Sequence, residues 1–257
     1  MITEDFISQY MDSPRELGLL ATESELRLWL LQNEPTPDQL EFASRFIRML
    51  VQKKAEVRER IFLNVSRLPK AQASTFEAFR TDDLSPAAAG QIESLKSLSF
   101  ISAKRNIIMI GPTGTGKTHL AMAIGYSCIK NGISPLFIKM SELKEKFKRA
   151  IESDSVGKMM LTLNKYTCLI IDEVGYCRFS KEETLLFFQL VDRFSLKDKS
   201  SIVLTSNKDI PFWKDLFSEY DALECTLDRL CNNSICIRFS GQSKRVGATS
   251  MIDINYN

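Results

Sequence analysis

Four side chains in two short stretches of the sequence have the types and spacing that phosphate chemistry needs. Lys117 and Thr118 close the run Gly-Pro-Thr-Gly-Thr-Gly-Lys-Thr, and Asp172 and Glu173 follow an apolar run. A lysine and a hydroxyl after spaced glycines fit the pattern of a phosphate-binding loop. Two carboxylates after a buried strand can supply a magnesium ligand and a general base. Together these residues predict a site for a nucleotide and Mg²⁺.

The phosphate-binding loop is expected to connect a strand, residues 107–110, to a helix, residues 119–129. Glycines let backbone N–H groups approach phosphate oxygens, and a helix N-terminus favours negative charge. We expect the lysine to reach the β- and γ-phosphates and the last threonine to ligate Mg²⁺. The predicted nucleotide-binding residues of the loop are Gly111, Pro112, Thr113, Gly114, Thr115, Gly116, Lys117 and Thr118.

The catalytic groups are expected at the ends of neighbouring strands. Asp172 can hold the hydration shell of Mg²⁺, and Glu173 can polarise a water for attack on the γ-phosphate. Asn207 follows another apolar run, residues 201–205. If that strand pairs between the other two, Asn207 faces the γ-phosphate and orients the attacking water. A strand that ends in Ser-Asn is otherwise typical of a simple turn.

The arrangement of apolar runs predicts an α/β fold. Helical segments separate five expected strands, so we expect a parallel five-stranded sheet covered on both faces. Residues 85–100 are expected to form one helix. The chain should divide into a small all-helical N-terminal domain, 1–70, and an ATPase domain, 71–257. The expected strands are 107–110, 135–139, 167–171, 201–205 and 235–239.

Composition excludes several classes of protein. The net charge of +2 does not by itself indicate a nucleic-acid-binding protein. No apolar run is long enough to span a membrane, and the acidic N-terminus lacks the features of a signal peptide, so we expect a cytoplasmic protein. Six cysteines without a C-x-x-C pair, and one histidine, make a zinc site improbable.

A local basic segment stands out against this balanced charge. A helix expected from Pro37 to about Leu63 begins with Thr36 as its N-cap. Residues 45–70 carry eight basic side chains and two acidic ones, whereas residues 1–44 are mainly acidic. This asymmetry suggests a surface for DNA phosphates, and a solvated helix face is the alternative. The candidate DNA-binding residues are Lys53, Lys54, Arg58 and Arg60.

Residues 73–79 carry two aromatic side chains just before the predicted ATPase core. Phe76 and Phe79 can stack on a purine base or pack in the core. We take Phe76 as the candidate nucleotide contact, with core packing as the alternative.

The motifs in this order resemble the AAA+ ATPases. More narrowly, they resemble the IstB-like proteins, which are helper ATPases of insertion-sequence transposition, and their helicase-loader relatives. The resemblance covers roughly residues 73–245. Its more specific parts are the Gly-Tyr after Asp-Glu and the Asp-Arg-Leu helix, because many proteins share the nucleotide motifs alone. The matching stretches are 111–121, 169–176, 204–207, 227–230 and 241–245, with 75–79 similar to the family's Thr-Leu-Glu-x-Phe segment.

The resemblance implies roles for two arginines and for Asn207. Asn207 corresponds to the first sensor, and Arg229 to an arginine finger that reaches a neighbour's nucleotide. From the residues alone, a surface arginine paired with Asp228 or Glu224 is the favoured interpretation of Arg229, and the resemblance shifts the preference to the finger. Arg245 is a weak candidate for nucleotide contact, because Lys244 stands where the family often has an aromatic. AAA+ proteins usually carry a helical lid after the last strand, and here we expect that lid to be absent or minimal.

These observations favour an ATP-dependent regulator that binds Mg²⁺ and ATP and hydrolyses ATP. The expected partners are duplex DNA, a cognate transposase and further copies of the chain, assembled with ATP and DNA, without a membrane. A replicative helicase loader is the nearest alternative. A small-molecule kinase and a non-hydrolysing scaffold are alternatives from other classes. Glu173 argues against the kinase, because it suits activation of water better than binding of a metabolite.

Overall fold

The structure is a computed structural model that describes residues 22–70, 74–79, 86–218 and 223–240, together with positions 4, 6, 7, 17 and 18. The chain forms two compact units, Met1–Ile61 and Phe62–Asn257. The border between these units lies inside a helix, whereas the sequence suggested a domain boundary between residues 70 and 71.

The segment after this border is attached to the second unit by several contacts. Leu68 is buried. The Phe137 N–H donates to the Ser66 carbonyl at 2.8 Å, which pairs part of an exposed sheet edge. The Tyr126 hydroxyl donates to the Pro69 carbonyl. These contacts explain why residues 62–70 lie with the second unit.

The first unit contains helix α2 (Glu23–Asn33) and most of helix α3 (Pro37–Val65). Thr22 starts α2 with a capping box. Thr36 caps α3 as expected, because its Oγ1 accepts a hydrogen bond from the Gln39 N–H at 3.3 Å. A small apolar cluster holds this unit together and consists of Phe6, Ile7, Leu26, Leu30 and Leu40.

The second unit is built on a five-stranded parallel sheet, as the sequence predicted, and the strand order is β2-β3-β4-β1-β5. Strand β4 lies between β1 and β3, which was the condition for Asn207 to face the phosphates. Consequently, the carboxyl ends of β1, β3 and β4 meet at one edge of the sheet. The strands are β1 (Asn106–Ile110), β2 (Pro135–Lys139), β3 (Cys168–Val174), β4 (Ser201–Ser206) and β5 (Ser234–Arg238).

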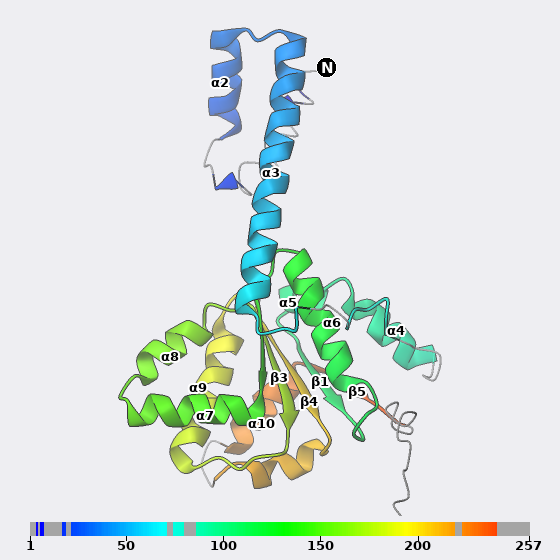
Figure 1. Cartoon of the computed structure of the whole chain (residues 1–257), viewed down its shortest axis with the longest axis vertical. Coiled ribbons are helices and arrows are strands. Elements are labelled where there is room, and N and C mark those ends of the chain that lie inside the picture. Colours follow the sequence, from blue (N-terminus) through cyan, green and yellow to red (C-terminus); the bar gives the residue numbers. More distant parts are fainter. Residues whose placement is uncertain are drawn as a thin grey trace, which may run out of the picture. The chain divides into compact units, whose positions relative to one another are not determined.

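Helices cover both faces of this sheet (Figure 1). One face packs against α4 (Pro86–Leu95), α5 (Ser99–Ser102) and α6 (Lys117–Lys130). The other face packs against α7 (Met140–Glu152), α8 (Val156–Leu163), α9 (Lys181–Leu196), the 3₁₀ helix η1 (Ile210–Leu216) and α10 (Leu223–Asn232).

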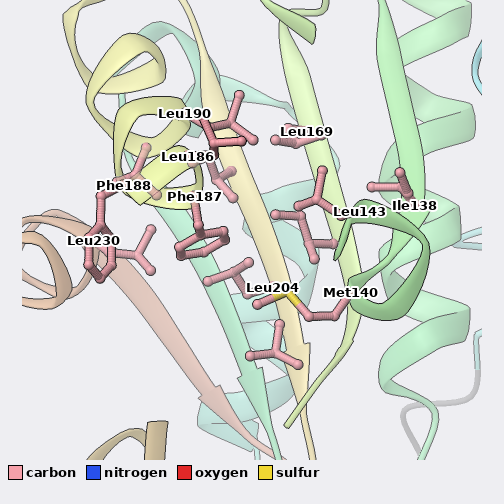
Figure 2. Packing of buried hydrophobic residues seen from close by; sticks show 14 of the residues in the cluster. Ile138, Met140, Leu143, Leu169, Leu186, Phe187, Phe188, Leu190, Leu204 and Leu230 are labelled. Carbon is pink, nitrogen blue, oxygen red and sulfur yellow. The ribbon is translucent and has the colours of Figure 1, made fainter. Parts of the chain in front are cut away.

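Alternate residues of each strand supply the two halves of the core. Ile108 of β1 belongs to the cluster on the α9 face, and Ile107 to the cluster on the α6 face. This alternation follows from the two-residue period of a strand. Figure 2 shows Phe187 of α9 near Leu204, and Leu190 of the same helix nearer Leu169. Apolar burial on both sides fixes the strand register, and therefore fixes the edge that carries the site.

Two expectations about helices need correction. In place of one helix reaching Phe100, α4 ends at Leu95 and α5 begins at Ser99, because Leu98 adopts φ +55° and interrupts the run. Helix α8 was not expected from the sequence. Residues 241–257, where a lid would lie, are outside the described part of the chain. The expectation of an absent or minimal lid concerns these residues.

Candidate active site

The phosphate-binding loop leaves β1 through a position that only glycine fits. Gly111 has φ +153°, and a Cβ there would lie 2.3 Å from the Phe239 carbonyl oxygen. Phe239 is held in place because its N–H donates to the Ile110 carbonyl at 2.7 Å. The last strand therefore constrains the start of the loop. Any side chain at position 111 would force the loop away from β5.

Lys117 is buried within the loop that it terminates. Its Nζ donates to the carbonyls of Gly111 and Pro112, each at 2.7 Å. The Thr115 hydroxyl also donates to the Pro112 carbonyl, at 2.9 Å. These contacts curl the loop around the ammonium group. The positive charge is thus positioned where the loop is built to receive phosphate.

Thr118 and Asp172 face each other across the first turn of α6 and the end of β3. The Thr118 hydroxyl lies 2.9 Å from one carboxylate oxygen and 3.2 Å from the other. Asp172 is only 1% exposed, and it also accepts a hydrogen bond from the Thr205 hydroxyl. Mg²⁺ prefers oxygen ligands, commonly one or two from the protein, and completes its shell with water and phosphate oxygens. A hydroxyl and a carboxylate in contact fit that requirement.

Glu173 occupies an irregular position in β3. The pairing between β3 and β4 shifts register between Ile171 and Val174, which marks a bulge. Glu173 has φ +62°, a left-handed conformation that costs a residue other than glycine about 1–3 kcal/mol. Its N–H donates to the Thr205 hydroxyl at 3.1 Å. Bulges re-aim side chains, and this one directs Glu173 toward the pocket that it lines.

Lys139, at the end of β2, forms an ion pair with Glu173 at 3.0 Å. The hydrogen bond to Glu173, followed by the attraction between the two charges, raises the pKa of Lys139. Both side chains are nearly half exposed, so solvent weakens the pair. The ion pair holds the carboxylate of Glu173, the candidate base, against the ammonium group of Lys139.

Asn207 follows β4 and lines the same pocket as Glu173. Its Nδ2 donates to the Tyr176 hydroxyl at 3.1 Å. Sheet order brings the two strand ends together, as expected from the sequence. The role of Asn207 in orienting water stays a prediction.

One pocket of about 420 Å³ collects most of these groups. Its lining includes the loop and strand-end residues Thr113, Gly114, Gly116, Lys117, Thr118, Glu173, Tyr176, Thr205, Ser206 and Asn207. It also includes Ala78, Phe79, His119 and Met122. Polar groups together with aromatic and apolar ones suit a nucleotide, which has both phosphates and a base.

The two aromatics of residues 73–79 lie in different places. Phe76 is buried in the core on the α6 face and is not among the residues that line this pocket. Phe79 lines the pocket and makes an edge contact with the His119 ring, with ring centroids 5.5 Å apart. The placement therefore favours Phe79 over Phe76 as the aromatic neighbour of a base.

Of the two arginines that the resemblance singled out, one lies within the described residues. Arg229 is 57% exposed on α10 and pairs with Asp192 of α9 at 3.0 Å. Asp192 is a partner that was not suggested from the sequence. Arg245 lies outside the described residues.

The four candidate DNA-binding residues all lie on α3 in the first unit. Lys53, Lys54 and Arg60 are exposed, and Arg58 is half-buried. Lys53 forms an ion pair with Glu56, one turn away, at 2.8 Å. Their contact with DNA stays a prediction.

Sequence reasoning did not assign Thr205, Lys139 or Tyr176 to the site. Strand order brings Lys139 there, whereas Thr205 and Tyr176 lie within stretches that match the family. The position of Lys139 at the end of an expected strand was the available signal, because carboxyl ends of parallel strands share an edge. Thr205 lay in the same run as Asn207, and Tyr176 in the same run as Glu173.

The fold and site define the class of this protein. A phosphate loop after β1, an Asp-Glu pair on β3 and an intervening β4 form an AAA+ P-loop core. DnaA from Aquifex aeolicus, solved with AMPPCP, shares this fold. The TM-score is 0.57 at 19% identity, over 67% of this chain and 51% of that chain.

The sequence matches the IstB-like ATP-binding proteins over residues 29–251, and the chain belongs to this family. It is 34% identical over 155 residues to a protein named as an ATP-binding protein of insertion sequence IS21 from Pseudomonas aeruginosa. That match covers 60% of this chain and 58% of the relative, so it falls short of two thirds of the relative's length.

Two other relatives extend this picture. A protein named as an ATP-binding protein of insertion sequence IS5376 from Geobacillus stearothermophilus is 32% identical over 206 residues, 80% of each chain. The replicative helicase loader DnaC of Buchnera aphidicola is 33% identical over 151 residues, 57% of this chain and 59% of that protein. The family is thus one of insertion-sequence ATP-binding proteins related to helicase loaders. Within the described part of the chain, no helix has the length and apolar character needed to cross a membrane.

Proposed function

We propose that this protein is an ATPase that self-assembles on duplex DNA and activates a partner transposase, with ATP hydrolysis as the switch. The observation that carries the proposal is the contact of Thr118 with Asp172 beside Glu173, at the pocket that holds the phosphate loop. The phosphate loop would be sufficient to bind ATP. Hydrolysis also requires a ligand for the cation and a carboxylate that water can reach, and Asp172 and Glu173 fit these two requirements.

Each polar residue has a distinct task in the proposed reaction. Lys117 exchanges its two carbonyl contacts for β- and γ-phosphate oxygens. Thr118 and Asp172 would hold a magnesium ion, which would neutralise charge on the phosphates. Glu173 accepts the proton of the attacking water, and Asn207 orients that water.

Glu173 must leave Lys139 before it can act as a base. The ion pair at 3.0 Å occupies the carboxylate that would polarise the water. Because both side chains are partly exposed, the pair is weak enough to break, at about 0–1 kcal/mol. A slow basal rate that rises when a ligand rearranges this edge is therefore expected.

Self-assembly follows from the position proposed for Arg229. A finger acts in a neighbouring subunit, because it supplies positive charge to a site that its own chain does not complete. Arg229 is exposed and its ion pair with Asp192 lies at the surface, so it can exchange that contact for phosphate. Removal of the γ-phosphate by hydrolysis then weakens the assembly.

DNA and the transposase are the proposed partners. The excess of basic residues on α3 supports contact with DNA phosphates, which needs no base recognition. The names of the insertion-sequence relatives support a transposase as the protein partner. The DnaC match supports a second candidate function, the loading of a replicative helicase.

Steady-state ATP hydrolysis with and without duplex DNA tests the proposal. Stimulation by duplex DNA is expected. Turnover only with a small phosphate acceptor would indicate a kinase instead, and ATP binding without turnover would indicate a scaffold. Separate pull-downs with the transposase and with a replicative helicase distinguish the two candidate partners.

A further inference from the structure

Tyr176 is a pocket residue to which the proposed reaction assigns no task. Its side chain is 60% exposed, although an aromatic ring gains from burial. It lines the pocket together with Glu173 and Asn207. Its hydroxyl accepts a hydrogen bond from the Asn207 Nδ2 at 3.1 Å. The exposed Tyr176 is thus held by the carboxamide of Asn207, the residue proposed to orient the attacking water.

The backbone before Tyr176 is shaped to make that contact. Gly175 has φ +124°, and a Cβ there would lie 3.2 Å from the Asn207 Oδ1. This glycine lets the chain turn after β3 and pass close to the end of β4. The Gly175 backbone therefore passes close to the carboxamide oxygen of Asn207. The carboxamide nitrogen of Asn207 donates to the Tyr176 hydroxyl.

This arrangement fixes one N–H of the Asn207 carboxamide and leaves the other for a substrate. A carboxamide nitrogen carries two N–H groups. One N–H of Asn207 is used by the Tyr176 hydroxyl. The second belongs to a carboxamide that lines the pocket, so it is the donor available to an anionic oxygen or a water there. Donors fixed before the reaction stabilise developing charge without reorganisation.

We propose that Tyr176 is a positioning residue for hydrolysis, and this inference rests on the proposed ATPase function. Its hydroxyl fixes the orientation of the Asn207 carboxamide, so that the remaining N–H points at the γ-phosphate or the attacking water. Tyr176 thus acts through Asn207 rather than replacing it. The bond forms between the ends of two neighbouring strands, and it couples the segment after Glu173 to β4.

Tyr176→Phe removes the hydroxyl and keeps the ring. We expect the kcat for ATP to fall about two- to tenfold, as for loss of one hydrogen bond, while the Kd for ATP changes less than about twofold. Tyr166→Phe is the matched control. The Tyr166 hydroxyl donates to the Val65 carbonyl at 3.3 Å. Tyr166 does not line the nucleotide pocket. This control should keep the wild-type kcat.

A double-mutant cycle with Asn207→Ala separates positioning from general damage. If Tyr176 acts through Asn207, then Tyr176→Phe should lower kcat no further in the Asn207→Ala background. Equal effects in both backgrounds would overturn the positioning role, as would a wild-type kcat in the single variant. A wild-type protein that binds ATP without turnover would overturn the proposed ATPase function and this role together. If the wild type hydrolyses ATP but either of the first two results is found, only the positioning role of Tyr176 is overturned.

Discussion

At the scale of single residues, two hydroxyls organise the two carboxylates of the site. The Thr205 hydroxyl donates to Asp172 and accepts from the Glu173 N–H, so one side chain ties both acidic residues to β4. Thr118 holds Asp172 from the other side. These donors satisfy the buried carboxylate, whose oxygens are the kind of ligand that Mg²⁺ prefers. Glu173 has no comparable enclosure and stays near solvent, where a base for water must be.

Lys117→Ala should abolish ATP binding and leave the fold intact. The substitution removes the ammonium that would contact the β- and γ-phosphates, and it also removes two hydrogen bonds within the loop. Isothermal titration with ATP measures the loss, and circular dichroism checks the fold. Lys130→Ala, at the other end of α6, is a matched control, since that lysine lies outside the pocket. ATP affinity that is unchanged in Lys117→Ala would contradict the nucleotide site.

Residue types alone predicted the phosphate loop and the Asp-Glu pair, because both are contiguous in the sequence. They did not predict that Lys139 would pair with Glu173, since that contact depends on β2 lying beside β3. The two aromatics show another limit. Phe76 and Phe79 are three residues apart, and only packing against the core decides which of them lines the pocket.

At the scale of elements, the parallel sheet determines which strand ends meet. Alternation of apolar runs and helical segments was sufficient to predict five parallel strands, and the observed order places β4 between β1 and β3. The border between the two units could not be predicted in the same way. It lies within α3, where the helical pattern continues without a break, and it depends on tertiary contacts of Ser66 and Leu68.

Helix α3 should provide sequence-tolerant contacts with DNA phosphates. Replacing Lys53, Lys54 and Arg58 with alanine should weaken duplex binding evenly across sequences. The dependence of log K on log salt should flatten by about 0.9 for each lost contact. Fluorescence anisotropy over a range of salt concentrations measures this slope.

A matched variant on α7 provides the control for the α3 experiment. Lys146, Lys148 and Arg149 lie on α7 of the second unit. If these alanine substitutions flatten the slope while those on α3 leave it unchanged, the DNA surface lies on α7. The circular dichroism spectra of both variants should match that of wild type, which would show that weaker DNA binding does not result from unfolding of a helix.

At the scale of the whole molecule, the proposed site needs a second subunit. Arg229→Ala should bind ATP normally and hydrolyse it poorly. Mixing it with Glu173→Gln subunits, which are inactive and keep their arginine, should restore part of the turnover, because the arginine acts in a neighbour's site. A titration of ATPase activity against the ratio of the two variants measures this. Activity that never rises above the sum of the separate variants would show that Arg229 does not act in trans.

The lifetime of the protein on DNA tests the switch most directly. Glu173→Gln keeps the size of the side chain and removes its charge, while Lys117, Thr118 and Asp172 remain to bind ATP and magnesium. Loss of a general base lowers the hydrolysis rate about 10²- to 10⁴-fold. In ATP, this variant should therefore dissociate from duplex DNA more slowly than wild type and form larger complexes. In ADP, both proteins should dissociate quickly. Equal lifetimes for the two proteins in ATP, with no shortening in ADP, would contradict a nucleotide-driven switch.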